Sequence, residues 1–196
     1  NNMNARDEVG NAHGVVYGGR FFEGKFITGN NNEYIELPAE KISINQYQTI
    51  SLEAFIRTDH LMPYYSMLAY FGDSDTVGYN YLFLSASSTY LTKTGISCAG
   101  KIEPWTTETN ILGPKIMDGN YHHLVMTFDN TSLRLFVDGV LIQSQEVMNP
   151  ENSISNISTE YAYIGKSGYL IDPTWWGAFD EFNIYEGVLE EKTIYK

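Results

Sequence analysis

Cysteine, basic residues and long apolar runs are all scarce in this sequence, and each shortage argues against a class of protein. Cys98 is the only cysteine among 196 residues, which excludes an intrachain disulfide and a cysteine-ligated metal cluster. Its apolar surroundings, GISCAG, predict a buried and unreactive thiol. No run approaches the roughly 18 apolar residues of a membrane-spanning helix, so we expect no membrane insertion.

The scarcity of basic residues also narrows the choice of partners. Lys and Arg together number 12 against 24 Asp and Glu, which gives a formal net charge of -12. Such a chain repels phosphate backbones and anionic membrane surfaces, so nucleic acid is not an expected partner. Cations and neutral ligands are the expected partners instead. The first ten residues, NNMNARDEVG, have neither the basic nor the apolar region of a leader peptide.

Helical periodicity is nearly absent, and short β-branched and aromatic runs recur between clusters of Gly, Asn, Asp and Pro. This pattern predicts an all-β sandwich or barrel, and residues 1–196 show no linker or internal repeat, so we expect a single domain. Aromatic residues make up 14% and charged residues only 18%, a balance typical of extracellular β domains. The expected strands are 15–17, 21–28, 33–37, 49–57, 65–71, 79–86, 94–99, 121–128, 132–137, 140–147, 161–165 and 178–185.

Turn chemistry gives the sharpest local predictions. Asp138-Gly139 separates two alternating runs, and Asp-Gly favours the type I′ turn of a two-residue hairpin. Residues 57–65 and 146–159 are expected to be surface loops, the second with little to bury. In residues 187–196 the apolar and charged positions predict a single helical turn.

Four segments, in this order, resemble one known family. NNNEYIELP (30–38), ISLEAFIR (50–57) and GNYHHLVMTFDNTSLRLFVDGVLI (119–142) are similar to successive strands of laminin-G-like domains. The last segment, residues 161–194 with the stretch GAFDEFNIYE, is similar to the closing strand of these domains. The chain thus resembles the laminin-G-like domains of the concanavalin A-like lectin/glucanase superfamily.

The resemblance implies a two-sheet antiparallel jelly-roll sandwich. It further implies a noncatalytic carbohydrate-binding, lectin-like module of a secreted or cell-surface bacterial protein (extracellular or periplasmic), accessory to a glycoside hydrolase. The expected partners are a glycan, either a polysaccharide or a glycoprotein sugar, and other domains of a larger parent protein. Two alternatives stay open: a protein-contact or scaffold domain without glycan binding, and a glucanase-type hydrolase.

The hydrolase alternative lacks its motif. The glucanases of the superfamily carry their acids as Glu-x-Asp-x-x-Glu, which projects alternate carboxylates from one face of a strand. Here Glu53 stands alone, and Asp180 and Glu181 are adjacent, so they are expected to point to opposite faces. The same alternation separates His122 from His123, which excludes chelation of one ion by both. We therefore expect no catalytic residue.

The adjacent tryptophans 175 and 176 are the best candidates for sugar contact. Alternation from Gly177 places Trp175 and Phe179 on one side, with Glu181 as a further candidate for that side, and places Trp176 on the other side with Ala178, Asp180 and Phe182. The family resemblance, with an aromatic residue usual at the first tryptophan position and a small or polar one at the second, implies that Trp175 is the one that packs in the core. A partly exposed indole can stack on the apolar face of a sugar ring. The alternative is that Trp176 covers the loop at 60–65. The expected ligand-binding residues are Trp176, Trp105, Tyr64 and Tyr65.

The resemblance also implies a structural calcium ion near the chain ends. Asp180 stands where the family has its closing acidic pair, and oxygens from Gly29 and Asn30 are expected beside it, because hard oxygen donors suit calcium. One departure weakens this set: Thr28-Gly29-Asn30 stands where the family often has Leu-Asp-Gly, which removes a carboxylate.

Overall fold

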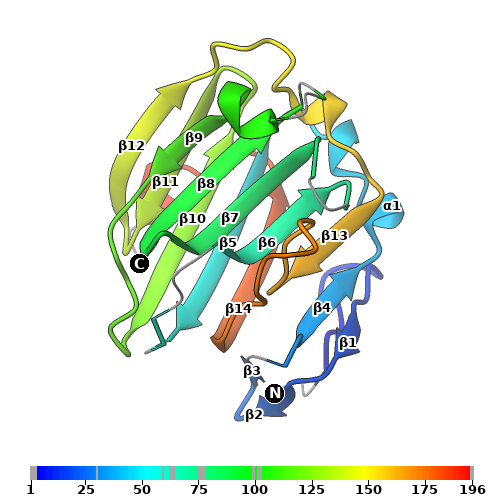
Figure 1. Cartoon of the computed structure of the whole chain (residues 1–196), viewed down its shortest axis with the longest axis vertical. Coiled ribbons are helices and arrows are strands. Elements are labelled where there is room, and N and C mark those ends of the chain that lie inside the picture. The colour runs from blue at the N-terminus through cyan, green and yellow to red at the C-terminus, as the bar shows by residue number, and fades with distance from the viewer. Residues whose placement is uncertain are drawn as a thin grey trace.

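Two antiparallel seven-stranded sheets lie face to face in the computed structural model of the chain, which describes residues 4–29, 31–58, 60–61, 65–74, 78–98, 100 and 103–194 (Figure 1). The first sheet contains, in spatial order, β1 (Val15–Tyr17), β4 (Tyr34–Leu37), β13 (Tyr161–Ile164), β6 (Ser66–Gly72), β7 (Tyr81–Ser88), β8 (Leu91–Ser97) and β9 (Thr109–Leu112). The second contains β12 (Val140–Glu146), β11 (Ser132–Val137), β10 (Tyr121–Phe128), β5 (Ile50–Arg57), β14 (Gly177–Glu186), β3 (Lys25–Thr28) and β2 (Arg20–Phe22). The predicted all-β jelly-roll sandwich is confirmed.

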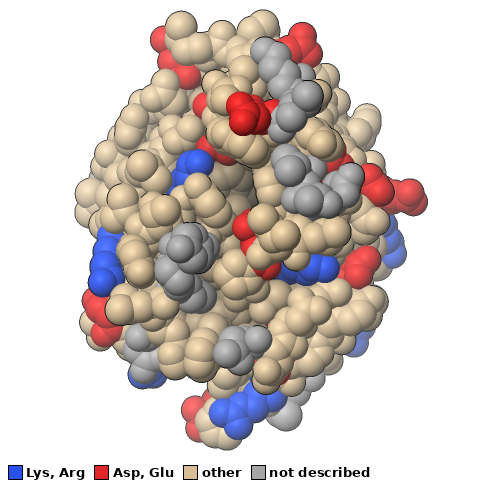
Figure 2. Space-filling view, in the orientation of Figure 1, with Lys and Arg blue, Asp and Glu red and all other residues tan. Residues whose placement is uncertain are grey.

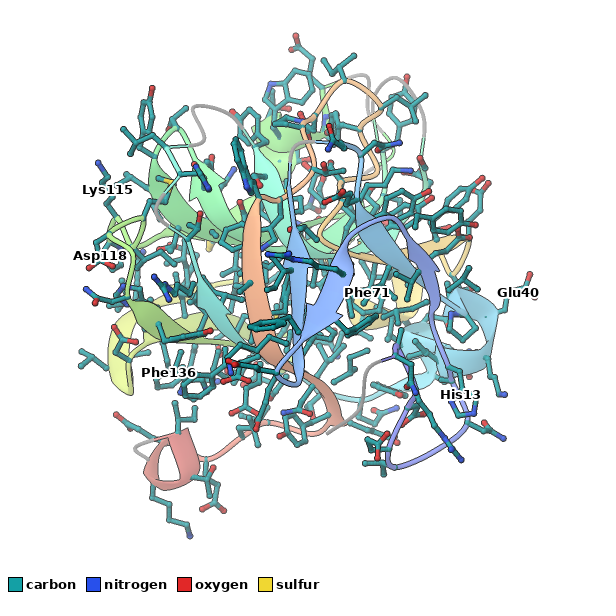
Figure 3. All side chains as sticks on the ribbon, turned by 90° about the horizontal axis from the view of Figure 1, so that it is seen from below. His13, Glu40, Phe71, Lys115, Asp118 and Phe136 are labelled. Atoms are coloured by element: carbon teal, nitrogen blue, oxygen red, sulfur yellow. The ribbon has the colours of Figure 1, made fainter. Side chains whose placement is uncertain are left out.

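Helical structure in the described residues is limited to single turns. They are α1 (Ala39–Ile42), α2 (Glu191–Ile194) and the 3-10 turns η1 (Ile44–Gln46), η2 (Pro104–Thr107) and η3 (Ile154–Asn156). The predicted turn at the end of the chain is α2, whose Ile194 packs on Val125 and Phe136 from the outer face of the second sheet. Figure 3 shows Phe136 on the side of that sheet facing α2 and Phe71 near the centre of the molecule. No helix in the described part of the chain has the length and apolarity needed to cross a membrane.

The core lies between the sheets and follows the period-2 pattern of the strands. On β5 every second residue, from Ile50 to Ile56, is fully buried, and Leu124 and Met126 on β10 lie in the same cluster. Burial of apolar side chains from both sheets is the main stabilising contribution to such a sandwich. Cys98 is half-buried at its edge, where burial raises the pKa of the thiol to about 12, as expected for an unreactive cysteine.

The hairpin prediction at Asp138-Gly139 is confirmed, and one expected strand divides in two. Asp138 and Gly139 have φ of 51° and 78°, as a type I′ turn requires, and join β11 to β12. The run expected as one strand at 21–28 is instead the hairpin β2–β3, because Glu23 and Gly24 also adopt positive φ (49° and 81°). A glutamate in this conformation gives no turn signal in the sequence.

Two further expectations are corrected. β9, which the sequence pattern did not predict, pairs with β8 along four residues. The loop at 146–159 buries more than its composition indicated: Ile154 and Ile157 are 0% and 2% exposed, and Asn152 is 1% exposed. The Asn152 side chain accepts a hydrogen bond from the Cys98 amide and donates to the Thr107 carbonyl, which fixes the loop across the sandwich edge.

A β-bulge changes the predicted faces of β14. Phe179 pairs with Ile56, but Glu181, not Asp180, pairs with Phe55, so Asp180 is the extra residue. The extra residue reverses the alternation beyond it. Phe182 therefore packs against the core, contrary to the prediction, and Glu181 is exposed on the outer face. Trp175 lies in the core as predicted, fully buried.

Candidate functional site

Aromatic side chains cover the outer face of the first sheet, above β6, β7 and β13. Tyr70, Tyr81, Phe83 and Tyr163 form a second hydrophobic cluster there, separate from the core between the sheets. Ring centroids lie 5.8 Å apart for Tyr81 and Phe83 and 6.2 Å apart for Tyr70 and Tyr81, within the usual range of aromatic pairs. Because this face is apolar too, β6 and β7 are buried on both sides.

The cluster forms the floor of a pocket of about 330 Å³, which we call the aromatic pocket. Figure 2 shows a hollow near the middle of this face, with basic and acidic side chains beside it. The volume lies at the lower end of the range typical of small-ligand sites. The residues that line it are Tyr65, Met67, Tyr70, Tyr81, Phe83, Lys93, Trp105, Glu108, Tyr169, Ile171 and Asp172.

One wall of the pocket holds a buried ion pair. Lys93 Nζ lies 2.5 Å from Glu108 Oε1, and the two side chains are only 14% and 3% exposed. The Tyr81 hydroxyl donates to the second Glu108 oxygen at 2.7 Å, and burial raises the pKa of Tyr81, so its proton is retained. Lys93 also lies over the Phe83 ring at 5.5 Å. The ammonium of Lys93 is therefore already neutralised within the protein.

Residues 165–176, which connect β13 to β14 across the outer face of the first sheet, contribute Tyr169, Ile171 and Asp172 to the lining. The turn at Gly168 lies directly on the Tyr70 ring, and a Cβ there would overlap ring atoms. Ser74 Oγ donates to the Gly168 carbonyl at 2.9 Å, and the Trp175 amide donates to the Gly165 carbonyl at 2.9 Å. These contacts hold the segment over the cluster.

Asp172 presents the remaining charge in the pocket. Burial raises the pKa of its carboxyl to about 6, against a weaker opposing effect of the Ser167 hydroxyl. Among the residues that the structure describes, no basic side chain forms an ion pair with Asp172. A partly buried carboxylate thus lines the same pocket as the aromatic rings and the neutral Lys93–Glu108 pair.

Two of the predicted ligand-binding residues meet at this pocket, and a third does not. Tyr65 and Trp105 both line it and are 42% and 48% exposed. Tyr64 lies outside the described residues. Trp176 is half-buried and packs against the core, with its indole stacked on the His60 ring at a centroid distance of 3.6 Å. The alternative in which Trp176 covers the loop at 60–65 agrees with this stacking, and sugar contact by Trp176 stays a prediction.

Most of the pocket could not be found from sequence. Tyr70, Tyr81 and Phe83 have the composition of ordinary strand residues, and nothing in the pattern marks them as lying on an outer face. One signal was available in the 165–176 segment: Leu170 and Ile171, just before Asp172 and Pro173, are apolar residues in a loop. Ile171 is 80% exposed.

The carboxylates considered for catalysis lie on the outer face of the second sheet. Glu53 accepts hydrogen bonds from Tyr185 and Asn183, and its other oxygen lies 2.8 Å from His123 Nε2. Burial favours the neutral acid, but these hydrogen bonds outweigh it and lower the pKa of Glu53. A glycosidase general acid needs a raised pKa, so Glu53 has the opposite property. His122 points elsewhere and lies between Asp118 and Asp138.

Asp180 and Gly29, the two described residues among those expected to bind calcium, lie apart. Asp180 is exposed and lies 3.4 Å from Lys25 Nζ, at one end of β3, whereas Gly29 follows the other end. The four-residue separation corresponds to about 13 Å along an extended strand. The Gly29 amide donates to Glu33, and Asn30 lies outside the described residues. The described residues contain no group of three or more metal-binding side chains. Asp180 and Gly29 are therefore too far apart to share one ion, and calcium binding stays a prediction.

A family comparison identifies the class of the domain. Residues 28–195 match the concanavalin A-like lectin/glucanases superfamily in its laminin-G form. The chain belongs to this superfamily. No curated protein matches it by sequence.

Several solved structures share the fold of this laminin-G-like chain at low sequence identity. Domain 4 of AbnA, a GH43 extracellular arabinanase from Geobacillus stearothermophilus in complex with arabinotriose, superposes with a TM-score of 0.70 and 17% identity over 98% of this chain and 91% of that one. The Ruminococcus gnavus IT-sialidase CBM40 bound to α2,3 sialyllactose gives 0.68 and 12% over 93% and 94%. Mouse laminin α1 domains LG4-5 give 0.66 and 15% over 91% and 46%.

Proposed function

We propose that the chain is a noncatalytic glycan-binding module of a secreted or cell-surface bacterial protein, accessory to a glycoside hydrolase, and that it binds sugar in the aromatic pocket. The observation that carries the proposal is the pair of exposed aromatic side chains, Tyr65 and Trp105, on the rim of a concave site that also holds a carboxylate, Asp172. Aromatic faces pack on the apolar face of a sugar ring, and a polar group beside them can bond its hydroxyls.

Two structural neighbours support this proposal by their ligands. The AbnA domain is described with arabinotriose, and the sialidase CBM40 with sialyllactose. Both are parts of carbohydrate-active enzymes, and AbnA is extracellular. Their low identity makes them evidence for the fold, so the assignment of glycan binding rests on the pocket of this chain.

The test is binding to a glycan array, followed by calorimetric titration of each responsive glycan. We expect dissociation constants between millimolar and micromolar, which is about -4 to -8 kcal/mol. Trp105→Ala should weaken binding at least about tenfold, the equivalent of about 1.4 kcal/mol, with little change in melting temperature because Trp105 is largely exposed. Trp176→Ala tests the alternative site at Trp176: if the sugar binds in the aromatic pocket, this variant should retain binding at a temperature where its melting curve shows it folded. Loss of binding in Trp176→Ala alone would place the site at Trp176, away from the pocket.

A second candidate, a protein-contact domain, is favoured by one other surface. A groove of about 680 Å³ lies between residues 4–12 and β14, with Phe21, Phe182 and Ile184 among its apolar lining. Exposed apolar grooves commonly mark protein contacts. This function would be preferred if the array gave no responsive glycan and substitution Val9→Asp, at a fully exposed residue of the same groove, disrupted association with a neighbouring domain of the parent protein.

A further inference from the structure

The charges around the aromatic pocket disfavour acidic sugars. Lys93 is the only basic residue among the described residues that line it, and its ammonium is already held by Glu108 at 2.5 Å. Asp172 has no such partner among the described residues, so the pocket carries one excess negative charge when Asp172 is ionised. An acidic sugar would meet this carboxylate without a free cation to bind its own, and like charges repel.

The aromatic rings of the pocket also favour a cation near Asp172. Tyr70 and Tyr169 lie near enough to Asp172 for its charge to contribute to their raised pKa, and Tyr65 and Trp105 line the same pocket. The face of an aromatic ring attracts a positive group. This attraction increases when the cation is partly desolvated, as it would be beside a carboxylate whose own surroundings are largely apolar. The protein's net charge of -12 adds a long-range attraction of the same sign.

We propose that the aromatic pocket recognises a sugar unit carrying a protonated amino group, with the ammonium between Asp172 and the aromatic rings. This inference rests on the proposed function, because it names the ligand class of the same pocket. It differs from the acidic ligand of the sialidase CBM40, whose complex contains sialyllactose. Two proteins that share this fold are thus expected to bind different sugars when the charges of their pockets differ.

The test compares two probes that differ in one group. Oligosaccharides of glucosamine carry free amines, whereas those of N-acetylglucosamine with the same length are neutral. Calorimetric titration should be carried out near pH 7 with the wild-type chain, Trp105→Ala and Asp172→Asn. Asp172→Asn keeps the side-chain size and removes the charge. A melting curve of each variant confirms that it is folded.

We expect the wild type to bind the glucosamine oligomer at least about tenfold more tightly than the acetylated one, and Asp172→Asn to lose most of that difference. Trp105→Ala should weaken both. Between about pH 7 and about pH 5 the amines of the glucosamine oligomer also gain protons, which strengthens binding to both proteins. The expected result is therefore a fall in the wild-type affinity relative to that of Asp172→Asn, because Asp172, with a pKa of about 6, becomes neutral.

Other charged or titratable groups around the pocket do not supply this pH dependence. The Tyr70 and Tyr169 phenols that face Asp172 have pKa values raised by burial, so they stay neutral between pH 5 and pH 7. Lys93 and Glu108 form an ion pair with each other at 2.5 Å. A change over this range in the ratio of the wild-type affinity to that of Asp172→Asn therefore reports on Asp172.

The outcomes separate the inference from the proposed function. Equal or tighter binding of the acetylated oligomer, or an unchanged preference in Asp172→Asn, would overturn the amino-sugar inference and leave glycan binding intact. Binding only of other array glycans, including acidic ones, would have the same meaning. No binding to any glycan would overturn the proposed function itself.

Discussion

The indole of Trp176 lies on the imidazole of His60, with 3.6 Å between the ring centroids and 18° between the planes. The contact ties the start of β14 to the loop that follows β5. Thr58 reinforces it, since its hydroxyl donates to the Trp176 carbonyl at 2.7 Å. One face of the indole is thus used within the protein.

Replacing Trp176 should chiefly affect stability. Trp176→Ala removes the ring stack and part of the packing on the core, so we expect the free energy of unfolding to fall by about 2 kcal/mol, below the cost of truncating a fully buried aromatic residue. Urea denaturation measures this change. A double-mutant cycle with His60→Ala isolates the stacking energy. An unchanged denaturation midpoint in Trp176→Ala would contradict the structural role.

Gly168 should tolerate no side chain. Because the Tyr70 ring is fully buried and occupies the space of a Cβ, Gly168→Ala must displace the 165–176 segment, at a cost of about 1–3 kcal/mol. Binding in the aromatic pocket should weaken with it, since Asp172 lies on the same segment. The control is Gly29→Ala, where the nearest atom to a new Cβ is at 3.5 Å, an ordinary contact. Similar thermal stability of the two variants would argue against the close packing of this segment.

Glu53 should make part of the stability dependent on pH. The hydrogen bonds that it accepts lower its folded-state pKa below the ordinary value of 4.5, despite the opposing effect of burial. A lowered pKa means that the stabilisation is complete above the unfolded-state pKa and is lost as the pH falls through the folded-state pKa. The free energy of unfolding of Glu53→Gln should therefore decrease less than that of the wild type between about pH 5 and about pH 3.

At neutral pH the same substitution should cost about 1–2 kcal/mol, because bonds to a charged acceptor become bonds to a neutral one. The exposed Glu160 provides a matched control, and Glu160→Gln should leave both stability and its pH profile close to those of the wild type. Identical pH profiles for Glu53→Gln and the wild type would show that the network around Glu53 does not depend on its charge.

Asp180 should not determine any response to calcium. Its carboxylate faces Lys25, and Gly29 lies beyond the far end of β3, so we expect Asp180→Asn to leave a calcium-dependent rise in melting temperature unchanged. The measurement is a thermal melt of metal-free protein with added calcium and with chelator. A rise present in the wild type and absent in Asp180→Asn would support the ligand role implied by the family resemblance.

Strand prediction succeeded where one face of a strand is buried and the other exposed. β5 shows this alternation, with buried Ile50, Leu52, Ala54 and Ile56, and its position was predicted to within one residue. It failed at β9, a four-residue strand at the edge of the first sheet with little pattern. The strand at 178–185 was predicted to within one residue, but the faces of its residues beyond Asp180 were not, because a bulge depends on pairing with a distant strand and leaves no local signal.

The binding pocket was predicted only at its rim. Trp105 and Tyr65 stand out in the sequence as aromatic residues in loops, and both line the pocket. Its floor was not predictable, since β6 and β7 are buried on both faces and their alternation is hidden. Asp172 was missed because its position in the pocket depends on the path of residues 165–176 across the sheet. The contact between Gly168 and Tyr70 fixes this path.

The three tryptophans occupy three different environments, so their intrinsic fluorescence can report on different parts of the chain. Trp175 has no accessible surface, Trp176 is half-buried against His60, and Trp105 is 48% exposed at the pocket rim. A dissolved fluorescence quencher reaches Trp105 first, so a bound sugar that covers this indole would shield it from quenching. Trp175, enclosed in the core at the end of the 165–176 segment, would respond only when that segment opens. Ligand binding and local opening can therefore be followed separately in the unlabelled protein.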